Sequence, residues 1–411
     1  MSESVGYLAL LRRNFAFRRL WYSQVVSQLG DWFDSIALYA LVYQLTGSGQ
    51  AIGALMVAQF LPSAVLGLWA GILVDRLPRK ALMIAADIGR AVLVLAFLLV
   101  REPDQIWIIY LVAVLKMSLT ALFEPARMAS ISSVAAREEL IAANAIGSAT
   151  WSAMLAIGAA LGGLVAGTLG TQAAFLIDSC SFLVSAALIW KVPIREQHLE
   201  GRVIQRQPLQ ELREGFTFLL NQRDLAIYAL CKALWSLGGG GVLLLLTVFG
   251  RGIFPIGVEG ALSIGLLYAA RGLGAGIGPI VAQRFGGSTN TFLRRMIGPA
   301  FVMTGLGYIG FSAAPSLWIA ALCVLFAHAG GSIQWTYSTV LLQQSAPHRL
   351  QGRVFSVELA LLTLATSSSS YLAGVAVDAL WDPRTVALVL AFVFIPPGLW
   401  LAWKFWPSTR V

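Results

Sequence analysis

The sequence predicts an all-α polytopic membrane protein with twelve transmembrane helices in two pseudo-symmetric six-helix bundles. Of its 411 residues, 58% are hydrophobic and only 12% are charged, whereas a soluble domain has roughly 25% charged residues. Apolar stretches long enough to cross a hydrocarbon core, about 20 helical residues each, recur along the chain. One long polar segment near the middle separates them into two sets.

The apolar stretches define the expected helices in order along the chain. The first set is expected at residues 20–46, 50–74, 80–101, 105–126, 143–168 and 172–191. The second set is expected at residues 224–250, 258–283, 295–314, 317–343, 352–380 and 384–406. Residues 1–191 then form the N-terminal bundle, residues 192–223 a cytoplasmic linker, and residues 224–411 the C-terminal bundle.

The linker contains apolar residues at helical spacing. Leu209, Leu212, Phe216 and Leu219 lie within residues 208–220. This pattern predicts an amphipathic helix on the membrane surface.

Basic residues are distributed unevenly between the two sides of the membrane. The side that carries both termini has 22 of the 29 Lys and Arg residues, and the other side has only Arg101, Arg251 and Arg384. Because basic loops stay in the cytoplasm, this asymmetry predicts a bacterial inner-membrane protein with both termini cytoplasmic. The net charge of +9 is explained by topology, so no nucleic-acid partner is expected. The three cysteines lack metal-ligand spacing, so no metal or cofactor is expected.

Several motifs identify a family resemblance over nearly the whole chain. They are LGDWFDSIAL and YQLTGSG in the first span, GILVDRLPRK after the second, FEPARMA and REELIAANAI around the fourth and fifth, and FLIDSCSFLVSAALI in the sixth. Together they resemble the major facilitator superfamily, in its drug-efflux branch of macrolide-efflux-like and enterobactin-exporter-like proteins. The resemblance implies the major facilitator fold and transport by alternating access.

The segment after the second span matches the family's loop signature G-x-x-x-D-R-x-x-R-[RK]. The matching residues are Gly71, Asp75, Arg76, Arg79 and Lys80. Gly71 permits close helix approach, and Asp75 can accept hydrogen bonds from a helix N-terminus. The resemblance implies that the helix whose N-terminus meets Asp75 is the eleventh, and that this contact closes the cytoplasmic side. The alternative is that the three basic residues only orient the hairpin.

The first span contains the main candidates for proton coupling. Gln24, Gln28, Asp31 and Ser35 share one helix face, which we expect to line a central cavity. An ionised carboxylate near mid-membrane costs roughly 2.5 to 3.5 kcal/mol unless it is paired or hydrated, so Asp31 is the first candidate. Asp34, about 60° around the helix, is the second. The alternative is that Asp31 only packs against hydroxyl groups of a neighbouring helix.

Other charged residues lie within the apolar spans or at their ends. Lys116 and Arg271 have no acid one turn away, so each needs a partner from another helix, water or an anionic substrate group. Glu124, Arg127 and Glu358 are further candidate cavity residues or charge partners.

The fifth span contains glycines that predict close helix packing, namely Gly158, Gly162 and Gly163. Ala159 stands where the efflux branch usually has proline, which puts the proline-dependent bend associated with antiport in doubt.

These features predict a monomeric secondary active transporter that is not an enzyme. Inward protons would drive export of a hydrophobic or amphipathic small molecule, and the other partner is the lipid bilayer. One alternative is an exporter or flippase of an anionic amphiphile, such as a siderophore or lysophospholipid, favoured if Lys116 and Arg271 face the cavity. A membrane-embedded enzyme is a weaker alternative, because the sequence has no H-E-x-x-H or G-x-S-x-G motif.

Overall fold

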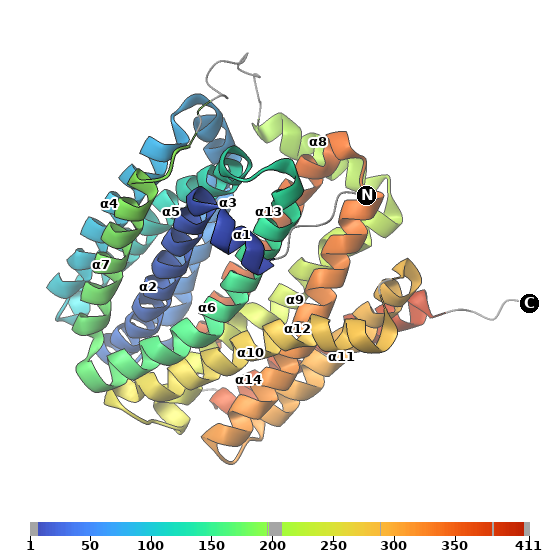
Figure 1. Cartoon of the computed structure of the whole chain (residues 1–411). Coiled ribbons are helices and arrows are strands. Elements are labelled where there is room, and N and C mark those ends of the chain that lie inside the picture. The colour runs from blue at the N-terminus through green and yellow to red at the C-terminus, as the bar shows by residue number, and fades with distance from the viewer. Residues whose placement is uncertain (1–6, 195, 197–207, 288, 380–381, 407–411) are drawn as a thin grey trace, which may run out of the picture.

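A computed structural model describes residues 7–194, 196, 208–287, 289–379 and 382–406. Within these ranges the regular elements are helices, without a strand. Figure 1 shows the N-terminal helices, in blue to green, beside the C-terminal helices, in yellow to red. The described part of the chain is thus an all-α protein, as the apolar periodicity predicts.

The first half of the chain forms one group of packed helices. Its helices are α1 (Tyr7–Arg13), α2 (Phe15–Thr46), α3 (Gly49–Arg76), α4 (Arg79–Leu95), α5 (Ile106–Val134), α6 (Leu140–Leu169) and α7 (Thr171–Trp190). Three short 3-10 turns lie between them: η1 (Ala96–Leu99), η2 (Pro103–Gln105) and η3 (Arg137–Glu139). α2 packs against α6 and α7, α4 packs against α5 and α7, and α3 packs against α5.

The second half forms a similar group. Its elements are α8 (Pro208–Leu220), α9 (Arg223–Val248), the π-helical turn η5 (Phe249–Ile253), the 3-10 turn η6 (Val258–Gly260), α10 (Ala261–Gly286), α11 (Asn290–Ser312), α12 (Leu317–Ser345), α13 (His348–Asp378) and α14 (Pro383–Phe405). α9 packs against α12, α13 and α14, and α11 packs against α12 and α14.

Ten of the described helices are long and apolar enough to cross a membrane. The two other long helices, α2 with 32 residues and α11 with 23, are more polar. α2 carries Asp31 and Asp34, and α11 carries Arg294 and Arg295. α2 packs against the membrane-length helices α6 and α7, and α11 packs against α12 and α14. Both therefore lie among the membrane-length helices, and the count of twelve spans stays a prediction.

The fourth predicted span was too short. It is expected to end at residue 126, but α5 continues through Pro125 to Val134. Proline is tolerated inside membrane helices where neighbouring groups satisfy the freed backbone carbonyl. Arg127 therefore lies within α5 and is buried.

The linker helix α8 forms at the predicted residues and contacts α13 and α9. Leu219 of the predicted apolar stripe is buried, whereas Phe216 is exposed. Glu214 forms an ion pair with Arg353 near the start of α13. The position of α8 relative to lipid stays a prediction.

The two ends of α13 define the two ends of the molecule. A helix of 31 residues is about 46 Å long, so Arg353 and Asp378 lie at opposite ends. The end where α8 meets Arg353 is called the linker end here, and the end near Asp378 is called the far end. Figure 1 shows α8 at the linker end, beside α13.

Two helix pairs form the most extensive contacts between the halves: α6 with α10, and α3 with α13. Their close approach depends on glycine. A Cβ atom on Gly163 would lie 2.7 Å from the carbonyl oxygen of Ala261, and one on Gly53 would lie 2.8 Å from that of Ser370. A side chain at either position would force the halves apart.

Asp378 joins the halves at the far end. Its carboxylate accepts hydrogen bonds from the backbone N–H groups of Gly49 (2.6 Å) and Gln50 (3.0 Å) and from the Ser48 hydroxyl (2.5 Å). These donors form the N-terminus of α3, whose dipole favours a negative charge. Gln50 also donates to the Tyr371 hydroxyl, at 2.6 Å. The last turns of α13 are thereby fixed to the first turn of α3.

We predict that Asp378→Ala opens the far end. Losing a carboxylate at a helix N-terminus weakens closure by about 0.3 to 1 kcal/mol, so the open population should rise roughly two- to fivefold. Spin labels on cysteines at the exposed positions Gln172 and Ala379 would measure this by pulsed electron paramagnetic resonance. Asp382→Ala, a change of the same type at the same end, is the control. An unchanged distance distribution in Asp378→Ala would show that this contact does not hold the far end closed.

Candidate functional site

A cavity of about 570 Å³ lies between the two halves. α2, α3, α5 and α6 line it from the first half, and α9 and α10 line it from the second. Tyr39 of α2 and Tyr268 of α10 stack with 5.6 Å between ring centroids. Their hydroxyl groups donate to the Gln59 side chain (2.9 Å) and the Leu243 carbonyl (3.0 Å).

The cavity is closed on one side. Gly163 packs against α10 between these tyrosines and the far end. Toward the linker end the lining continues along α5 to Ile131 and along α6 to Asn144. The cavity therefore reaches toward the linker end and is closed toward the far end.

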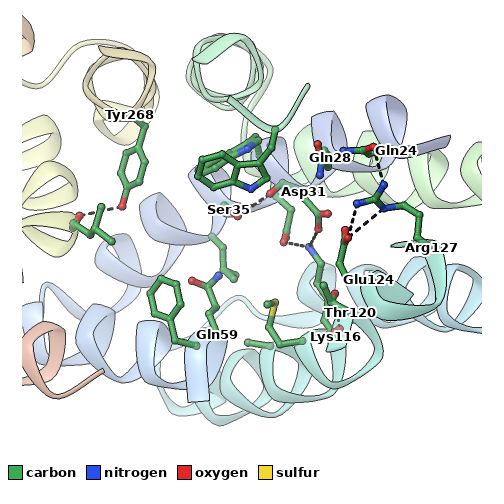
Figure 2. A pocket seen from close by; sticks show the side chains of 18 of the residues that line it. Gln24, Gln28, Asp31, Ser35, Gln59, Lys116, Thr120, Glu124, Arg127 and Tyr268 are labelled. Atoms are coloured by element: carbon green, nitrogen blue, oxygen red, sulfur yellow. Dashed lines mark hydrogen bonds and ion pairs between the residues drawn. The ribbon is translucent and has the colours of Figure 1, made fainter. Parts of the chain in front are cut away.

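The predicted polar face of α2 lines this cavity. Gln24, Gln28, Asp31 and Ser35 all contribute, as Figure 2 shows. The Ser35 hydroxyl donates to the Asp31 carbonyl, at 2.7 Å, so it is bound within its own helix. The helical spacing of these four residues was enough to locate the face.

Lys116 of α5 binds three carboxylates. Its Nζ lies 3.0 Å from Asp31 Oδ1, 2.5 Å from Asp34 Oδ2 and 3.2 Å from Asp178 Oδ2. Lys116, Asp34 and Asp178 are buried, while the Asp31 side chain is 33% exposed, on the cavity wall. Lys116 therefore takes its partners from other helices, which was one of the alternatives that the sequence left open. These four residues are called the Lys116 cluster below.

Asp178 of α7 was not among the residues that the sequence placed in the site. It reaches the cluster because Gly30 brings α2 and α7 together: a Cβ atom on Gly30 would lie 2.8 Å from Ser181 Cβ. An acid within an apolar span was a usable signal. Its partner, 62 residues away in the sequence, could not be read from local spacing.

A second ion pair lies nearer the linker end. Arg127 Nη2 is 2.8 Å from Glu124 Oε2, and Arg127 Nη1 donates to the Gln24 side chain at 2.9 Å. The amide of Gln24 donates in turn to the Gly147 carbonyl, at 3.2 Å. This chain of contacts links α5, α2 and α6, and Figure 2 shows its first two links.

Arg271 of α10 also lines the cavity. Its Nε is buried and has no hydrogen-bond partner in the described part of the chain, and its guanidinium carbon lies 5.8 Å from the centre of the Tyr268 ring. Glu358, by contrast, does not line the cavity. It is a charge partner, 3.0 Å from Lys232 Nζ, and the pair joins α13 to α9.

No grouping of His, Cys, Asp and Glu suited to a metal ion was found among the described residues. The cavity thus offers carboxylates, two ion-paired cations, the guanidinium of Arg271 and aromatic walls. Such a lining can exchange protons and bind a small amphipathic molecule.

Comparison with known proteins identifies the family. The Major Facilitator Superfamily profile matches residues 20–360. The chain belongs to this superfamily. Its fold agrees with the xylose transporter XylE from E. coli, with a TM-score of 0.70 over 96% of each chain at 12% identity.

Three relatives match almost the full length of this superfamily member. An uncharacterized MFS-type transporter from Bacillus subtilis is 28% identical over 95% of this chain and 93% of its own. Macrolide efflux protein A from Streptococcus pyogenes is 24% identical, over 93% and 95% respectively. The enterobactin exporter from Citrobacter koseri is 26% identical, over 96% and 92%. The protein is a multi-pass membrane transporter with efflux-type relatives, and it is not an enzyme.

The superfamily's loop signature runs from the last turns of α3 to the first turn of α4. The surroundings of Gly71 and the side chain of Asp75 fall outside the described part of the structure. Closure by Asp75 therefore stays a prediction. Arg76 is exposed, and the Arg79 guanidinium donates to the Ala129 carbonyl at 3.2 Å, which fixes α4 to α5.

A carboxylate that the sequence did not indicate caps the start of α4. The backbone N–H groups of Arg79 and Lys80 donate to Glu196, at 3.1 and 3.0 Å. Glu196 lies just after α7, so this cap ties the end of the sixth long helix to the loop signature.

The glycines of α6 place it between two helices. A Cβ atom on Gly158 would lie 2.9 Å from Trp32 Cβ, and one on Gly162 would lie 2.9 Å from the Trp32 carbonyl oxygen. Gly163 faces α10. Because Trp32 lines the cavity, this close packing also positions one of its aromatic walls. Ala159, which replaces the usual proline, is buried within the helix.

Proposed function

We propose that this superfamily member exports a hydrophobic or amphipathic small molecule in exchange for protons. The Lys116 cluster is the observation that supports proton coupling. The direction of transport is supported by two relatives whose names describe export, macrolide efflux protein A and the enterobactin exporter.

The charges of the Lys116 cluster do not balance when every carboxylate is ionised. Three negative charges then surround one ammonium group, because Asp31, Asp34 and Asp178 all contact the same nitrogen. Two like charges 4 Å apart repel by about 4 kcal/mol at an effective dielectric constant of 20. A proton on one carboxylate relieves this repulsion. We propose that the cluster holds at least one proton when the cavity has no substrate.

Asp31 is the proposed site of exchange, because it is the one member of the cluster that is substantially exposed to the cavity. Asp34 and Asp178 are buried and hold Lys116 in place. Asp31 would gain and lose this proton in turn as the cavity opens to the two sides of the membrane. Loss of that proton would restore the negative charge of Asp31 beside Lys116. The attraction between α2 and α5 would then change. That change couples proton release to the movement of the helices.

Alternating access requires the two ends to open in turn. In the present structure Asp378 holds the far end closed and the cavity reaches toward the linker end. We propose that this is the substrate-loading state and that the linker end faces the bacterial cytoplasm. The basic residues support this orientation even though Arg127 lies inside α5, because Arg101, Arg251 and Arg384 remain the only ones assigned to the opposite side.

Labelling of α8 tests the orientation. A cysteine at the exposed residue Gln210, in a variant without Cys180, Cys231 and Cys323, should react with an impermeant maleimide in inverted vesicles but not in intact cells. A cysteine at Asp104, beside the far end of α5, is the matched control and should show the reverse. Reaction of the Gln210 variant in intact cells would place the linker outside.

Substitution of Asp31 tests the coupling. Asp31→Asn mimics the protonated carboxyl, so accumulation of substrate driven by a pH gradient should fall at least tenfold, while substrate binding stays within about twofold. The measurement is transport of a chemically varied panel of compounds into inverted vesicles with an imposed gradient. Asp104→Asn, an exposed change of the same type, should transport like the wild type. Equal gradient-driven transport by wild type and Asp31→Asn would exclude Asp31 as the exchange site.

A further inference from the structure

The charged residues that line the cavity divide between the halves. Five of the six are in the first half, on α2 and α5, and each takes part in an ion pair: Asp31, Asp34, Lys116, Glu124 and Arg127. The sixth, Arg271, belongs to α10 in the second half. It has no ion pair with any described residue.

Arg271 is fixed at the closed side of the cavity. The next residue, Gly272, packs against the Ala156 backbone of α6. A Cβ atom on Gly272 would lie 2.7 Å from Ala156 Cα. Tyr268, one turn earlier, forms the stacked pair with Tyr39. Arg271 therefore lies where the two halves meet, beside the aromatic residues that close the cavity.

A guanidinium group at this depth needs a partner. Charged side chains inside a membrane are retained where they pair, meet water or bind a substrate. The Tyr268 ring, at 5.8 Å, provides a cation–π contact but no acceptor in the plane of the guanidinium. The planar set of N–H donors matches a carboxylate, which it can bind with two parallel hydrogen bonds.

We propose that Arg271 is the anion-binding position of the cavity, and that the transported molecule is a monocarboxylate with an aromatic body. This inference rests on the proposed function only in taking the cavity as the transport path. It narrows the substrate class from amphipathic compounds in general to those with one acidic group.

Three features of the cavity select this class. Arg271 is the one unpaired cation among the described lining residues, so it neutralises one negative charge. The Lys116 cluster, on the opposite half, has an excess of carboxylates, which repels a second negative charge on the molecule. The walls are aromatic, with Trp32, Tyr39, Phe60, Trp151 and Tyr268 among the lining residues. A volume of about 570 Å³ suits a drug-sized molecule.

The test compares each acid with its own methyl ester. Probes are 1-naphthylacetate, 4-biphenylcarboxylate and 4-(1-pyrenyl)butyrate, each paired with its ester, added to purified protein in lipid nanodiscs. Binding is measured by quenching of intrinsic tryptophan fluorescence, corrected with empty nanodiscs. The proteins are wild type, Arg271→Gln, Arg271→Lys and the control Arg284→Gln, which changes an exposed arginine on the same helix.

Wild type and Arg284→Gln should bind at least one acid tenfold or more tightly than its ester. Arg271→Gln should bind acid and ester alike. Arg271→Lys keeps the charge but loses the planar donor set, so its preference should be intermediate. If Arg271→Gln does not fold, the reduced preference of Arg271→Lys carries the test. No acid preference in the wild type, or an undiminished preference in both Arg271 variants, would overturn the proposal.

Asp31→Asn separates this inference from the proposed function. It should keep the acid preference in nanodiscs, because Asp31 does not bind the anion. If the preference depends on Arg271 while Asp31→Asn still transports with the gradient, the anion site stands and the coupling site is wrong. If Asp31→Asn loses transport while acids and esters bind alike, the coupling stands and the anion site is wrong.

Discussion

The first half of this transporter depends on the ion pairs of the Lys116 ammonium group with three carboxylates. This group draws α2 and α7 toward α5 through Asp31, Asp34 and Asp178. Removing charged groups from water in a membrane is costly unless they are paired, so the three helices must keep this contact or rehydrate it. Gly30 makes the arrangement possible, because a larger residue there would separate α2 from α7.

The ion pairs of Lys116 and Lys232, one in each half, balance their charges differently. In the second half, Lys232 meets one carboxylate, Glu358, across α9 and α13, so that pair is neutral without a proton. In the first half, Lys116 meets three. A balanced pair stabilises packing, whereas an unbalanced cluster changes its charge when a proton arrives or leaves. This contrast is the reason that we propose proton exchange in the first half and substrate binding at the unpaired Arg271 of the second half.

The fold could be predicted from the sequence because apolar length and helical spacing are local properties. They located the long helices and placed Gln24, Gln28, Asp31 and Ser35 on the cavity wall. They failed at Pro125, where surrounding helices allow α5 to continue. They also could not show that Asp178 reaches Lys116 or that Glu358 faces Lys232, because such contacts depend on how distant helices pack. Arg271 carried the right signal, a deep cation without a local acid, but only the structure placed it on the cavity wall.

The most direct test of a proton held by the Lys116 cluster is infrared spectroscopy of the purified transporter at neutral pH. A protonated carboxyl group absorbs separately from a carboxylate, and its band shifts in heavy water. We expect such a band in the wild type, and expect it to change in Asp31→Asn. The same band should persist when Glu358, the carboxylate of the neutral pair, is replaced by Gln. A spectrum with no protonated carboxyl, or one that no substitution within the cluster alters, would contradict the proposed store of protons.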